Sequence, residues 1–417
     1  MPKENVLIMA VKSREQKSNL FQSSLDELKS LCETAGGIVC KVITQNRQQI
    51  HPATYIGEGK ISEIKQEIIN YNIELIVSND ELSPGQIRNL SDYFNIRIID
   101  RSQLILDIFA QRAKTKEGQL QVELAQLEYL LPRLRGQGTM LSRLGGGIGT
   151  RGPGETKLET DQRYIRQRIT DIKRRLKLVV QQRTQYRRRR KANDVFQIAI
   201  VGYTNAGKST LFNNLTNTES LAEDKLFATL DPLTRKIKLP TGFEVLITDT
   251  VGFLQKLPTS LIAAFKSTLE EVTEADFLLH VVDVSNENEV QQQETVMEIL
   301  KQLGADTIPM LTVYNKKDLL QETFIPLNHP YMFLSAFNED DLLHLLFKIE
   351  ELLKEKWEMY YLLLNPDEGK MIQRLKSETI VTEKFYLEDK NQYMIKGYMP
   401  NNHPLQFLLK EKNDFND

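Results

Sequence analysis

The spacing of hydrophobic residues along residues 1–103 predicts a small α/β unit. Short runs rich in β-branched residues alternate there with amphipathic stretches of ten or more residues, which is the pattern of strands separated by helices. We expect strands near residues 5–11, 37–44, 73–78 and 96–100, and helices near residues 21–34, 60–70 and 84–93. Strands that are connected through helices favour a parallel sheet.

Residues 104–192 have a different hydrophobic pattern, in which apolar residues recur at alternating steps of three and four. The two series are Leu120, Leu124, Leu127, Leu131 and Leu134, and Ile165, Ile169, Ile172, Leu176 and Val179. Two such seams predict helices that pack along each other as an antiparallel hairpin. Eight glycines between Gly136 and Gly154 do not fit a helix, so residues 136–156 form the expected tip.

Apolar strand runs and helical stretches alternate again in residues 193–356, which predicts a mostly parallel sheet flanked by helices. From residue 357 to residue 417, the segments YYLLLN, EGKMIQRLKSE, IVTEKFYLED and QYMIKGYM predict a strand, a helix and two further strands. The expected fold is therefore a multidomain α/β protein with an N-terminal α/β unit, a long helical hairpin, a larger α/β domain and a small α+β C-terminal domain.

Charge changes this picture, because the formal net charge of −2 hides a strongly basic block. Residues 131–191 contain 18 basic and four acidic residues, a local charge of +14. Such a block favours a polyanionic partner, and glycines with arginines at a hairpin tip suit the irregular surface of folded RNA. A soluble, solvated loop is the simpler alternative. The candidate RNA contacts are Arg133, Arg135, Arg143, Arg151, Arg187, Arg188, Arg189 and Arg190.

The strongest chemical signal is the sequence GYTNAGKST, which follows the apolar run FQIAIV and precedes a helical stretch. Strand, glycine-rich loop and helix are the setting of a phosphate-binding loop, whose backbone N–H groups surround phosphates at a helix N-terminus. We expect Lys208 to reach the β- and γ-phosphates and the Ser209 hydroxyl to bind Mg²⁺. The loop residues are Gly202, Tyr203, Thr204, Asn205, Ala206, Gly207, Lys208, Ser209 and Thr210.

Three later segments narrow the nucleotide to GTP or GDP. The strand run that ends in DTVG provides a carboxylate beside the Mg²⁺ and, at Gly252, an N–H for a γ-phosphate oxygen. The carboxylate of Asp318 in NKKD accepts the N1–H and N2–H₂ donors of guanine, which adenine lacks. The residues of these segments are Asp249, Thr250, Val251, Gly252, Asn315, Lys316, Lys317, Asp318, Ser335 and Ala336.

The other residues of the base-binding segments have more local roles. We expect Asn315 to hydrogen-bond the opposite side of the base and the aliphatic stem of Lys316 to cover its face. A backbone N–H of Ser335 or Ala336 is expected to meet guanine O6. Between the first two motifs lies LFATLDPLTR, in which Thr229 is the candidate switch threonine and Thr234 its competitor.

The composition excludes several kinds of site and segment. Cys32 and Cys40 are the two cysteines of the sequence, which excludes a disulfide framework and a site of four thiolates. The apolar run at residues 6–11 is too short for a signal peptide, and no stretch of eighteen consecutive apolar residues occurs. We expect a cytoplasmic protein that is monomeric and not stably inserted in a membrane; a peripheral membrane pool stays open.

The motifs resemble those of the HflX GTPases, which belong with the Obg-like translation-factor GTPases. The resemblance covers most of the chain and rests on GYTNAGKST, LFATLDPLTR, DTVGF, NKKD and SA, and above all on GTMLSRLGGGIGTRGPGETKLETDQR at residues 138–163. It implies that the FATLD segment lies at the nucleotide, with Thr229 as a second magnesium ligand. That segment consists of Phe227, Ala228, Thr229, Leu230 and Asp231.

The same resemblance implies a partner and a role. Members of the family bind the large ribosomal subunit, and the glycine-rich tip would reach toward the peptidyl-transferase centre. The implied activity is GTP-dependent splitting or rescue of stalled or inactive ribosomes, with hydrolysis driving release. An ATPase activity of the N-terminal region is also suggested for the family, but residues 1–190 contain no second phosphate-binding loop motif, so we do not include it.

Catalysis is assigned to Lys208, Thr229 and Gly252, and the metal to Ser209 and Thr229. Phe253 occupies the position where Ras-like enzymes have a water-orienting glutamine. A phenylalanine cannot polarise water, which predicts slow hydrolysis by the free protein. The alternative interpretation is a GTP-gated switch that binds RNA or a membrane surface and whose hydrolysis is incidental.

Overall fold

The computed structural model describes residues 3–134, 157–192, 195–217, 226–227, 229–255, 266–320, 324–401 and 403–406. At residues 157–158, 182–184, 186–192 and 266–269 it describes the backbone alone. Two compact units divide the chain. The first contains Met1–Gln181, Asp224–Asp231 and Gln255–Ser267, and the second contains Gln182–Glu223, Pro232–Leu254 and Thr268–Asp417. The predicted domain boundaries stay predictions.

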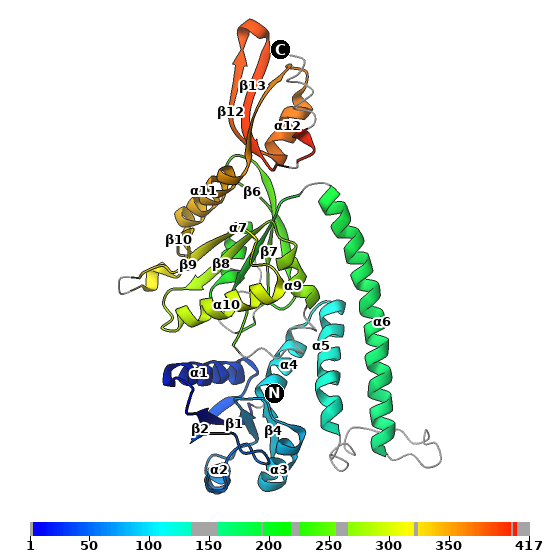
Figure 1. Ribbon diagram of the computed structural model, residues 1–417, viewed down its shortest axis with the longest axis vertical. Helices are drawn as coiled ribbons and strands as arrows, with labels where there is room; N and C mark the ends of the chain where they lie inside the picture. Colours follow the sequence, from blue (N-terminus) through cyan, green and yellow to red (C-terminus); the bar gives the residue numbers. More distant parts are fainter. Residues whose placement is uncertain are drawn as a thin grey trace. The chain divides into compact units, whose positions relative to one another are not determined.

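The first unit is built on a parallel sheet in the order β2-β1-β3-β4, as the sequence pattern predicts. Its elements are β1 (Asn5–Ser13), α1 (Ser18–Thr34), β2 (Ile38–Arg47), α2 (Glu58–Asn70), β3 (Leu75–Ser78), α3 (Pro84–Phe94) and β4 (Arg97–Asp100). Helices cover both faces: α2 and α3 pack on one side of the strands and α1 lies on the other (Figure 1). Both faces are therefore buried, which explains the continuous apolar run of β1.

The elements that follow are α4 (Arg101–Arg112), α5 (Lys116–Leu130), the 3₁₀ turn η1 (Leu131–Leu134) and α6 (Lys157–Ala192). The predicted hairpin helices are α5 and α6, and α6 belongs to the first unit up to Gln181. Helices α5 and α6 lie side by side (Figure 1) and bury Leu124, Ile169 and Ile172 between them. Arg168 forms an ion pair with Glu123 at 2.6 Å across this seam. The glycine-rich tip at residues 136–156 lies outside the described residues.

The second unit contains a six-stranded sheet in the order β10-β9-β8-β5-β7-β6. Only the β6–β7 pair of this sheet is antiparallel, among the residues described. The elements are β5 (Gln197–Gly202), α7 (Lys208–Thr216), β6 (Leu233–Lys238), β7 (Glu244–Asp249), α9 (Lys266–Thr273), β8 (Phe277–Asp283), α10 (Glu289–Leu303), β9 (Met310–Asn315), η3 (Lys317–Leu319), β10 (Tyr331–Phe333) and α11 (Glu339–Lys356). Because β5 lies between β8 and β7, the connections diverge at its carboxyl end, where ligands of such sheets bind.

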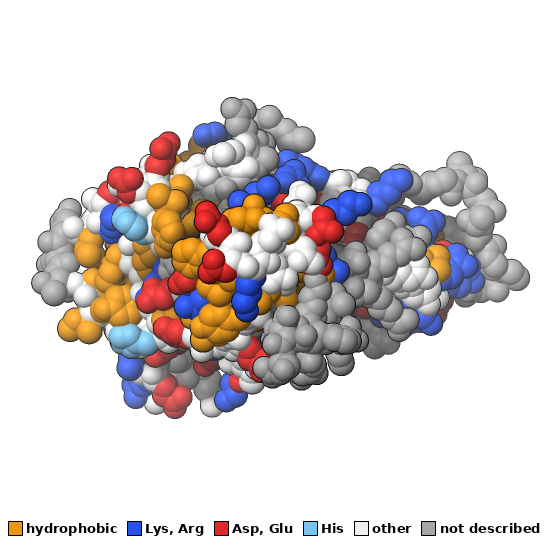
Figure 2. Space-filling model, turned by 90° about the horizontal axis from the view of Figure 1, so that it is seen from above, with side chains coloured by type: hydrophobic (Ala, Val, Ile, Leu, Met, Phe, Trp, Pro, Cys, Tyr) orange, Lys and Arg blue, Asp and Glu red, His pale blue; other side chains and the backbone are white. Residues whose placement is uncertain are grey.

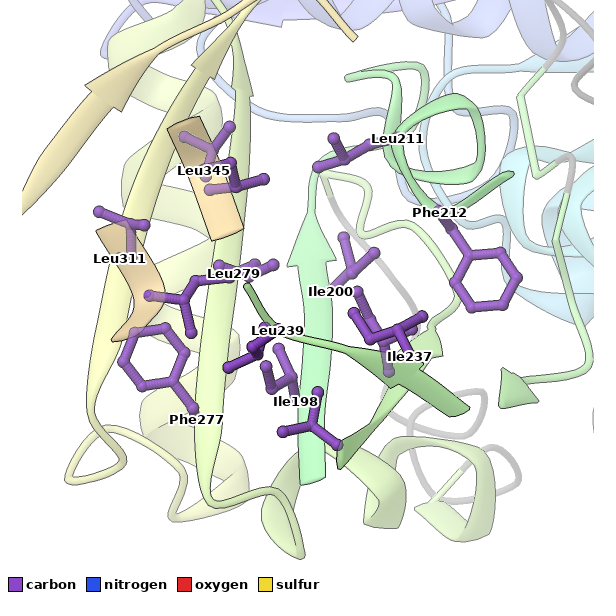
Figure 3. Packing of buried hydrophobic residues seen from close by; sticks show 14 of the residues in the cluster. Ile198, Ile200, Leu211, Phe212, Ile237, Leu239, Phe277, Leu279, Leu311 and Leu345 are labelled. Carbon is purple, nitrogen blue, oxygen red and sulfur yellow. The ribbon is translucent and has the colours of Figure 1, made fainter. Parts of the chain in front are cut away.

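The core of this sheet surrounds the buried side chains of β5. Ile198 and Ile200 pack against Leu279 of β8, and Leu211 of α7 and Leu345 of α11 complete the cluster (Figure 3). Helix α10 lies on the opposite face of the sheet from α7 (Figure 1). This packing fixes the end of β5, from which the glycine-rich loop starts.

A three-stranded antiparallel sheet in the order β11-β13-β12 follows in the same unit. Its elements are β11 (Glu358–Leu364), α12 (Gly369–Glu378), β12 (Ile380–Leu387), η4 (Glu388–Lys390) and β13 (Gln392–Met399), which confirms the predicted strand, helix and two strands. Ile380 is fully buried in the core of the larger sheet, and Trp357 packs edge-on against Phe196 and Phe243 at 5.6 and 5.3 Å between ring centroids. Trp357, Ile380 and Tyr398 thus join the core of the α/β sheet, while Tyr360, Leu362 and Leu375 belong to a smaller core of their own.

Charges of both signs are interspersed with hydrophobic side chains on the face shown in Figure 2. In that view the coloured side chains do not form a broad surface of a single sign. Among the residues that the structure describes, no helix combines the length and the apolar character needed to cross a bilayer.

Candidate nucleotide site

The glycine-rich loop joins the carboxyl end of β5 to the first turn of α7, as the sequence predicts. Gly202 and Gly207 have φ angles of +150° and +92°, a region that side-chain-bearing residues rarely adopt. A Cβ at Gly202 would lie 2.3 Å from the carbonyl oxygen of Val281, and one at Gly207 would lie 2.2 Å from Asn315 Nδ2. Both glycines are therefore required by close approach as well as by backbone conformation.

The remaining residues of the loop differ in exposure. Tyr203, Thr204 and Ala206 are buried, and Asn205 is exposed in a left-handed conformation. The hydroxyl of Thr204 is buried without a hydrogen-bond partner among the residues described. A buried hydroxyl without a partner is costly in the free protein, so it fits a loop that receives a polar ligand.

Lys208, the first residue of α7, is buried with its ammonium group inside the loop. Its Nζ donates to the carbonyl oxygen of Tyr203 at 2.6 Å. Burial lowers the pKa of Lys208 to about 8, and the negative charge of Asp249 opposes this shift. A phosphate group would favour the charged form, so the site is electrostatically suited to a polyanionic ligand.

Ser209 and Asp249 form the pair that would hold a metal ion. The Ser209 hydroxyl donates to Asp249 Oδ2 at 2.7 Å, and Asp249 is buried at the end of β7. Oxygen ligands of this kind are what Mg²⁺ prefers, so these residues fit the ion. When bound, Mg²⁺ supplies positive charge beside the phosphates; Ser209 would contact it and Asp249 would orient that hydroxyl.

The DTVG segment lies directly against the glycine-rich loop. Thr204 N–H donates to the carbonyl oxygen of Phe253 at 2.9 Å, and Phe253 N–H donates to that of Gly202 at 3.1 Å. A Cβ at Gly252 would lie 2.9 Å from Lys208 Nζ, so only glycine allows this approach. Thr250 and Val251 are buried, and the Thr250 hydroxyl donates to the carbonyl oxygen of Ile200 at 2.6 Å.

Asn315, at the end of β9, connects the base-binding loops to the phosphate-binding loop. Its Nδ2 donates to the carbonyl oxygen of Ala206 at 2.9 Å, and its Oδ1 accepts from Ala336 N–H at 3.0 Å. Asp318 follows in η3 with its side chain exposed, where it is accessible to a base. Lys316 is half-buried, and its Nζ forms an ion pair with Asp283 Oδ2 at 2.6 Å.

The backbone N–H groups of Ser335 and Ala336 have partners within the free protein. Ser335 N–H donates to Asp341 Oδ2 at 2.8 Å, and Ala336 N–H donates to Asn315 Oδ1. Both N–H groups are thus engaged within the protein rather than directed at a ligand. Their contact with guanine O6 stays a prediction.

The FATLD segment belongs to the first unit, unlike the motifs above. Phe227 and Leu230 are buried, Thr229 and Asp231 are half-buried, and Ala228 lies outside the described residues. The role of Thr229 and its neighbours at the nucleotide therefore stays a prediction.

Arg133, one of the candidate RNA contacts, has partners within the first unit. The Arg133 side chain is only 10% exposed, and its guanidinium donates to Glu81 Oε1 and to the carbonyl oxygens of Tyr129 and Leu82. Its charge is thus used within the first unit, where it also lies over the Tyr129 ring. Arg135, Arg143 and Arg151 lie outside the described residues, and Arg187, Arg188, Arg189 and Arg190 belong to α6 with only their backbone described.

Three residues at the site were missed by the sequence reasoning. Asp283, at the end of β8, pairs with Lys316, and Asp341, near the start of α11, pairs with Lys317 at 2.5 Å. His280 is fully buried in β8, and burial together with the charge of Lys208 lowers its pKa to about 4, so the imidazole is neutral. For His280 and Asp283 the available signal was a polar residue inside or at the end of the apolar run FLLHVVD; no such signal marked Asp341.

Comparison with known proteins agrees with this geometry. Family models described as GTP-binding GTPase N-terminal, GTP-binding GTPase middle region and 50S ribosome-binding GTPase match residues 22–110, 112–190 and 197–316. GTPase HflX of Alkalihalophilus pseudofirmus is 50% identical over 410 residues, which cover 98% of this chain and 97% of that protein. GTPase HflX of Escherichia coli K12 is 43% identical, with 90% of this chain and 89% of that protein covered.

A solved structure also matches this chain. The crystal structure of the complex of SsGBP and GDP is 24% identical in sequence, covers 84% of this chain and 98% of that one, and superposes with a TM-score of 0.47.

The lowered pKa of Lys208 predicts that nucleotide affinity depends on pH. Bound phosphates raise this pKa, so binding takes up a proton when the pH exceeds about 8 and takes up none well below it. The Kd for GDP should rise about tenfold between about pH 7 and about pH 9. Calorimetry in buffers of different ionisation enthalpy should give about one proton taken up per nucleotide at the higher pH; no uptake there would contradict the assignment.

The exposed carboxylate of Asp318 predicts guanine selectivity. Asp318→Asn loses a charge-assisted acceptor pair, so the affinity for GDP should fall by about tenfold or more, while xanthosine diphosphate, which has an acceptor at C2, should bind more tightly than before. Competition against a fluorescent nucleotide measures both. Asp306→Asn removes an exposed carboxylate elsewhere in the same unit and should change neither; unchanged selectivity in Asp318→Asn would refute the assignment.

Proposed function

The chain belongs to the HflX family of GTPases, and on this basis we propose that it is a Mg²⁺-dependent GTPase that acts on the large ribosomal subunit. It binds GTP and hydrolyses it to GDP. The glycine-rich loop holds the phosphates through backbone N–H groups and Lys208, Gly252 N–H holds the γ-phosphate, and Asp318 selects guanine. The α5–α6 hairpin contacts rRNA.

The observation that carries the proposal is the basic, solvent-exposed surface of α6. Its exposed basic side chains are Arg163, Arg166, Lys173, Arg174, Arg175 and Lys177. Ion pairs with α5 account for part of the charge, since Arg168 binds Glu123 and Lys173 binds Glu128. Arg174 also pairs with Asp171 at 3.3 Å. Arg166, Arg175 and Lys177 are exposed, where they can contact phosphate oxygens. The description of relatives of residues 197–316 as 50S ribosome-binding GTPases supports the choice of partner.

RNA suits this surface better than lipid. A helix that lies in a membrane interface needs a wide apolar face, but Ile169 and Ile172 of α6 are buried against α5. The exposed apolar residues of α6, within its described side chains, are Tyr164, Leu178 and Val180. Tyr164 lies near Arg163 and Arg166 in the sequence, and an exposed aromatic ring between arginines is suited to stacking on a base.

The proposed role is splitting or rescue of stalled or inactive ribosomes, with GTP hydrolysis driving release of the protein. The Phe253 side chain is buried at 2% exposure and has no group that orients water, so the free protein hydrolyses GTP slowly. Contact with the ribosome then supplies the rearrangement that positions the water. A GTP-gated binding switch with incidental hydrolysis is the second candidate.

Neutralising exposed cations of α6 tests the RNA contact. Replacement of Arg166, Arg175 and Lys177 by glutamine should weaken binding to large subunits and reduce the slope of log affinity against log salt by about two. Co-sedimentation over a series of salt concentrations measures this. The matched control replaces Lys301, Lys384 and Lys390, which are exposed in the second unit; an equal loss in both variants, or none in the first, would contradict the proposal.

Comparison of GTP with a non-hydrolysable analogue separates the two functions. If hydrolysis drives release, the analogue should hold the protein on large subunits for much longer than GTP, and subunits should accelerate GTP turnover. Dissociation measured after rapid dilution reports the first, and phosphate release reports the second. Equal dissociation rates with GTP and the analogue would favour the binding switch instead.

A further inference from the structure

The carboxylate of Asp231 binds at the start of helix α5. Asp231 Oδ2 accepts the backbone N–H groups of Lys114 and Thr115 at 3.0 and 2.9 Å, and Oδ1 accepts the Thr115 hydroxyl at 2.6 Å. These residues belong to the same compact unit, although 116 positions of sequence separate Asp231 from Thr115. A carboxylate is favoured at this place because N–H groups and the helix dipole both point toward it.

Gly118 in the first turn of α5 makes this contact possible. A Cβ at this position would lie 2.5 Å from Asp231 Oδ1 and 3.1 Å from Thr115 Oγ1. Glycine is a poor helix former, so its use in the first turn of a 15-residue helix has a structural reason here. The absence of a side chain lets the carboxylate reach the helix end.

Phe227 fixes the other end of the same segment. Its ring packs edge-on against Phe109 of α4, with 4.4 Å between the centroids, and only 2% of the residue is exposed. Its φ of +58° is a left-handed conformation that bulky residues rarely adopt. Such a conformation persists only where the surroundings determine it, so the packing on Phe109 fixes the backbone at Phe227.

A second contact involves the segment that follows DTVG. Arg101, at the start of α4, is buried and pairs with Glu27, and its NH2 group donates to the carbonyl oxygen of Gln255 at 3.4 Å. Gln255 is three residues past Gly252 and belongs to the first unit. Helix α4 and the start of α5 thus hold both chain segments that adjoin the γ-phosphate motifs.

We infer that Asp231 is a positioning residue of the GTPase site, through which the start of α5 controls the segment that carries Thr229. We call residues 109–118, from Phe109 to Gly118, the elbow. The inference rests on the proposed function in one respect, the assignment of Thr229 to Mg²⁺ and the γ-phosphate. Because α5 continues from the elbow into the hairpin, the contact links the GTP state to the helix that packs against α6.

The elbow should strengthen binding of a GTP analogue, because it orders the segment that carries Thr229 before the nucleotide binds. The elbow holds the segment at Phe227 and at Asp231, on either side of Thr229, so less conformational freedom remains to be lost when Thr229 engages the nucleotide. GDP has no γ-phosphate for Thr229 to engage. Loss of the Asp231 contact should therefore weaken binding of a GTP analogue and leave GDP binding unchanged. By linkage, the analogue should in turn strengthen the contact at the elbow.

Nucleotide affinities test this with the full-length protein and Mg²⁺. Asp231→Ala should raise the Kd of a non-hydrolysable GTP analogue about fivefold or more, with the Kd of GDP changed less than about twofold. Thr115→Val should act in the same direction, and Thr115→Ser should restore wild-type affinity because it keeps the hydroxyl. Equal effects on both nucleotides, or tighter binding of the analogue, would overturn the inference.

Gly118→Ala distinguishes this role from a loss of folding. The new Cβ displaces the carboxylate of Asp231, while alanine favours the helix more than glycine does. The variant should therefore lose affinity for the analogue although α5 is at least as stable as before. Loss of analogue affinity with unchanged circular dichroism supports the inference, and unchanged affinity refutes it. Asp306→Ala, which removes an exposed carboxylate, is the matched control.

Amide exchange provides a readout that does not depend on ribosomes. In the wild type, the amides of Lys114 and Thr115 should exchange more slowly with the analogue than with GDP, and in Asp231→Ala they should exchange fast in both states. Identical exchange of these amides in the two nucleotide states of the wild type would overturn the coupling. Failure of ribosome binding would instead contradict the proposed function and leave these measurements unaffected.

Discussion

The side-chain amide of Asn315 joins the loops of the nucleotide site to one another. It donates to the loop carbonyl of Ala206, accepts from the backbone of Ala336, and packs so closely on Gly207 that no Cβ fits between them. These groups are buried, and a buried polar group without its partner is costly. The phosphate-binding and base-binding loops are therefore parts of one hydrogen-bond network, and its geometry is set by the register of parallel strands β5, β8, β9 and β10.

The charged side chains at the nucleotide site and those on α6 act in different ways. In the second unit a few charges face each other within hydrogen-bond distance, as in the pair of the half-buried Lys316 with the buried Asp283. Here desolvation decides protonation, as the lowered pKa values of Lys208 and His280 illustrate. On α6 the charges are many, mostly exposed and mostly positive. Such charges act collectively, through attraction for a polyanion.

The sequence was informative where structure depends on local periodicity or on a fixed motif spacing. It predicted the parallel N-terminal sheet, the α5–α6 seam and the loop between β5 and α7, because each is determined within some tens of residues. It did not predict the partners of Arg133, Ala336 or Asp231. Their contacts join positions that are distant in the sequence. The residues adjacent to a charged residue in the sequence do not predict whether that residue pairs with a group inside the protein. Arg133 lies in a basic stretch, yet its partner Glu81 is 52 positions away.

The shared core of the second unit has a consequence for how the chain is made. Ile380 and Trp357 complete the cluster that also contains Ile198 and Ile200 of the first strand of the larger sheet. During synthesis, strand β5 emerges from the ribosome long before β12. The apolar residues of the larger sheet that pack against Ile380 therefore stay uncovered until Ile380 has also emerged. The core beneath the phosphate-binding loop is thus complete only after Ile380 has been synthesised.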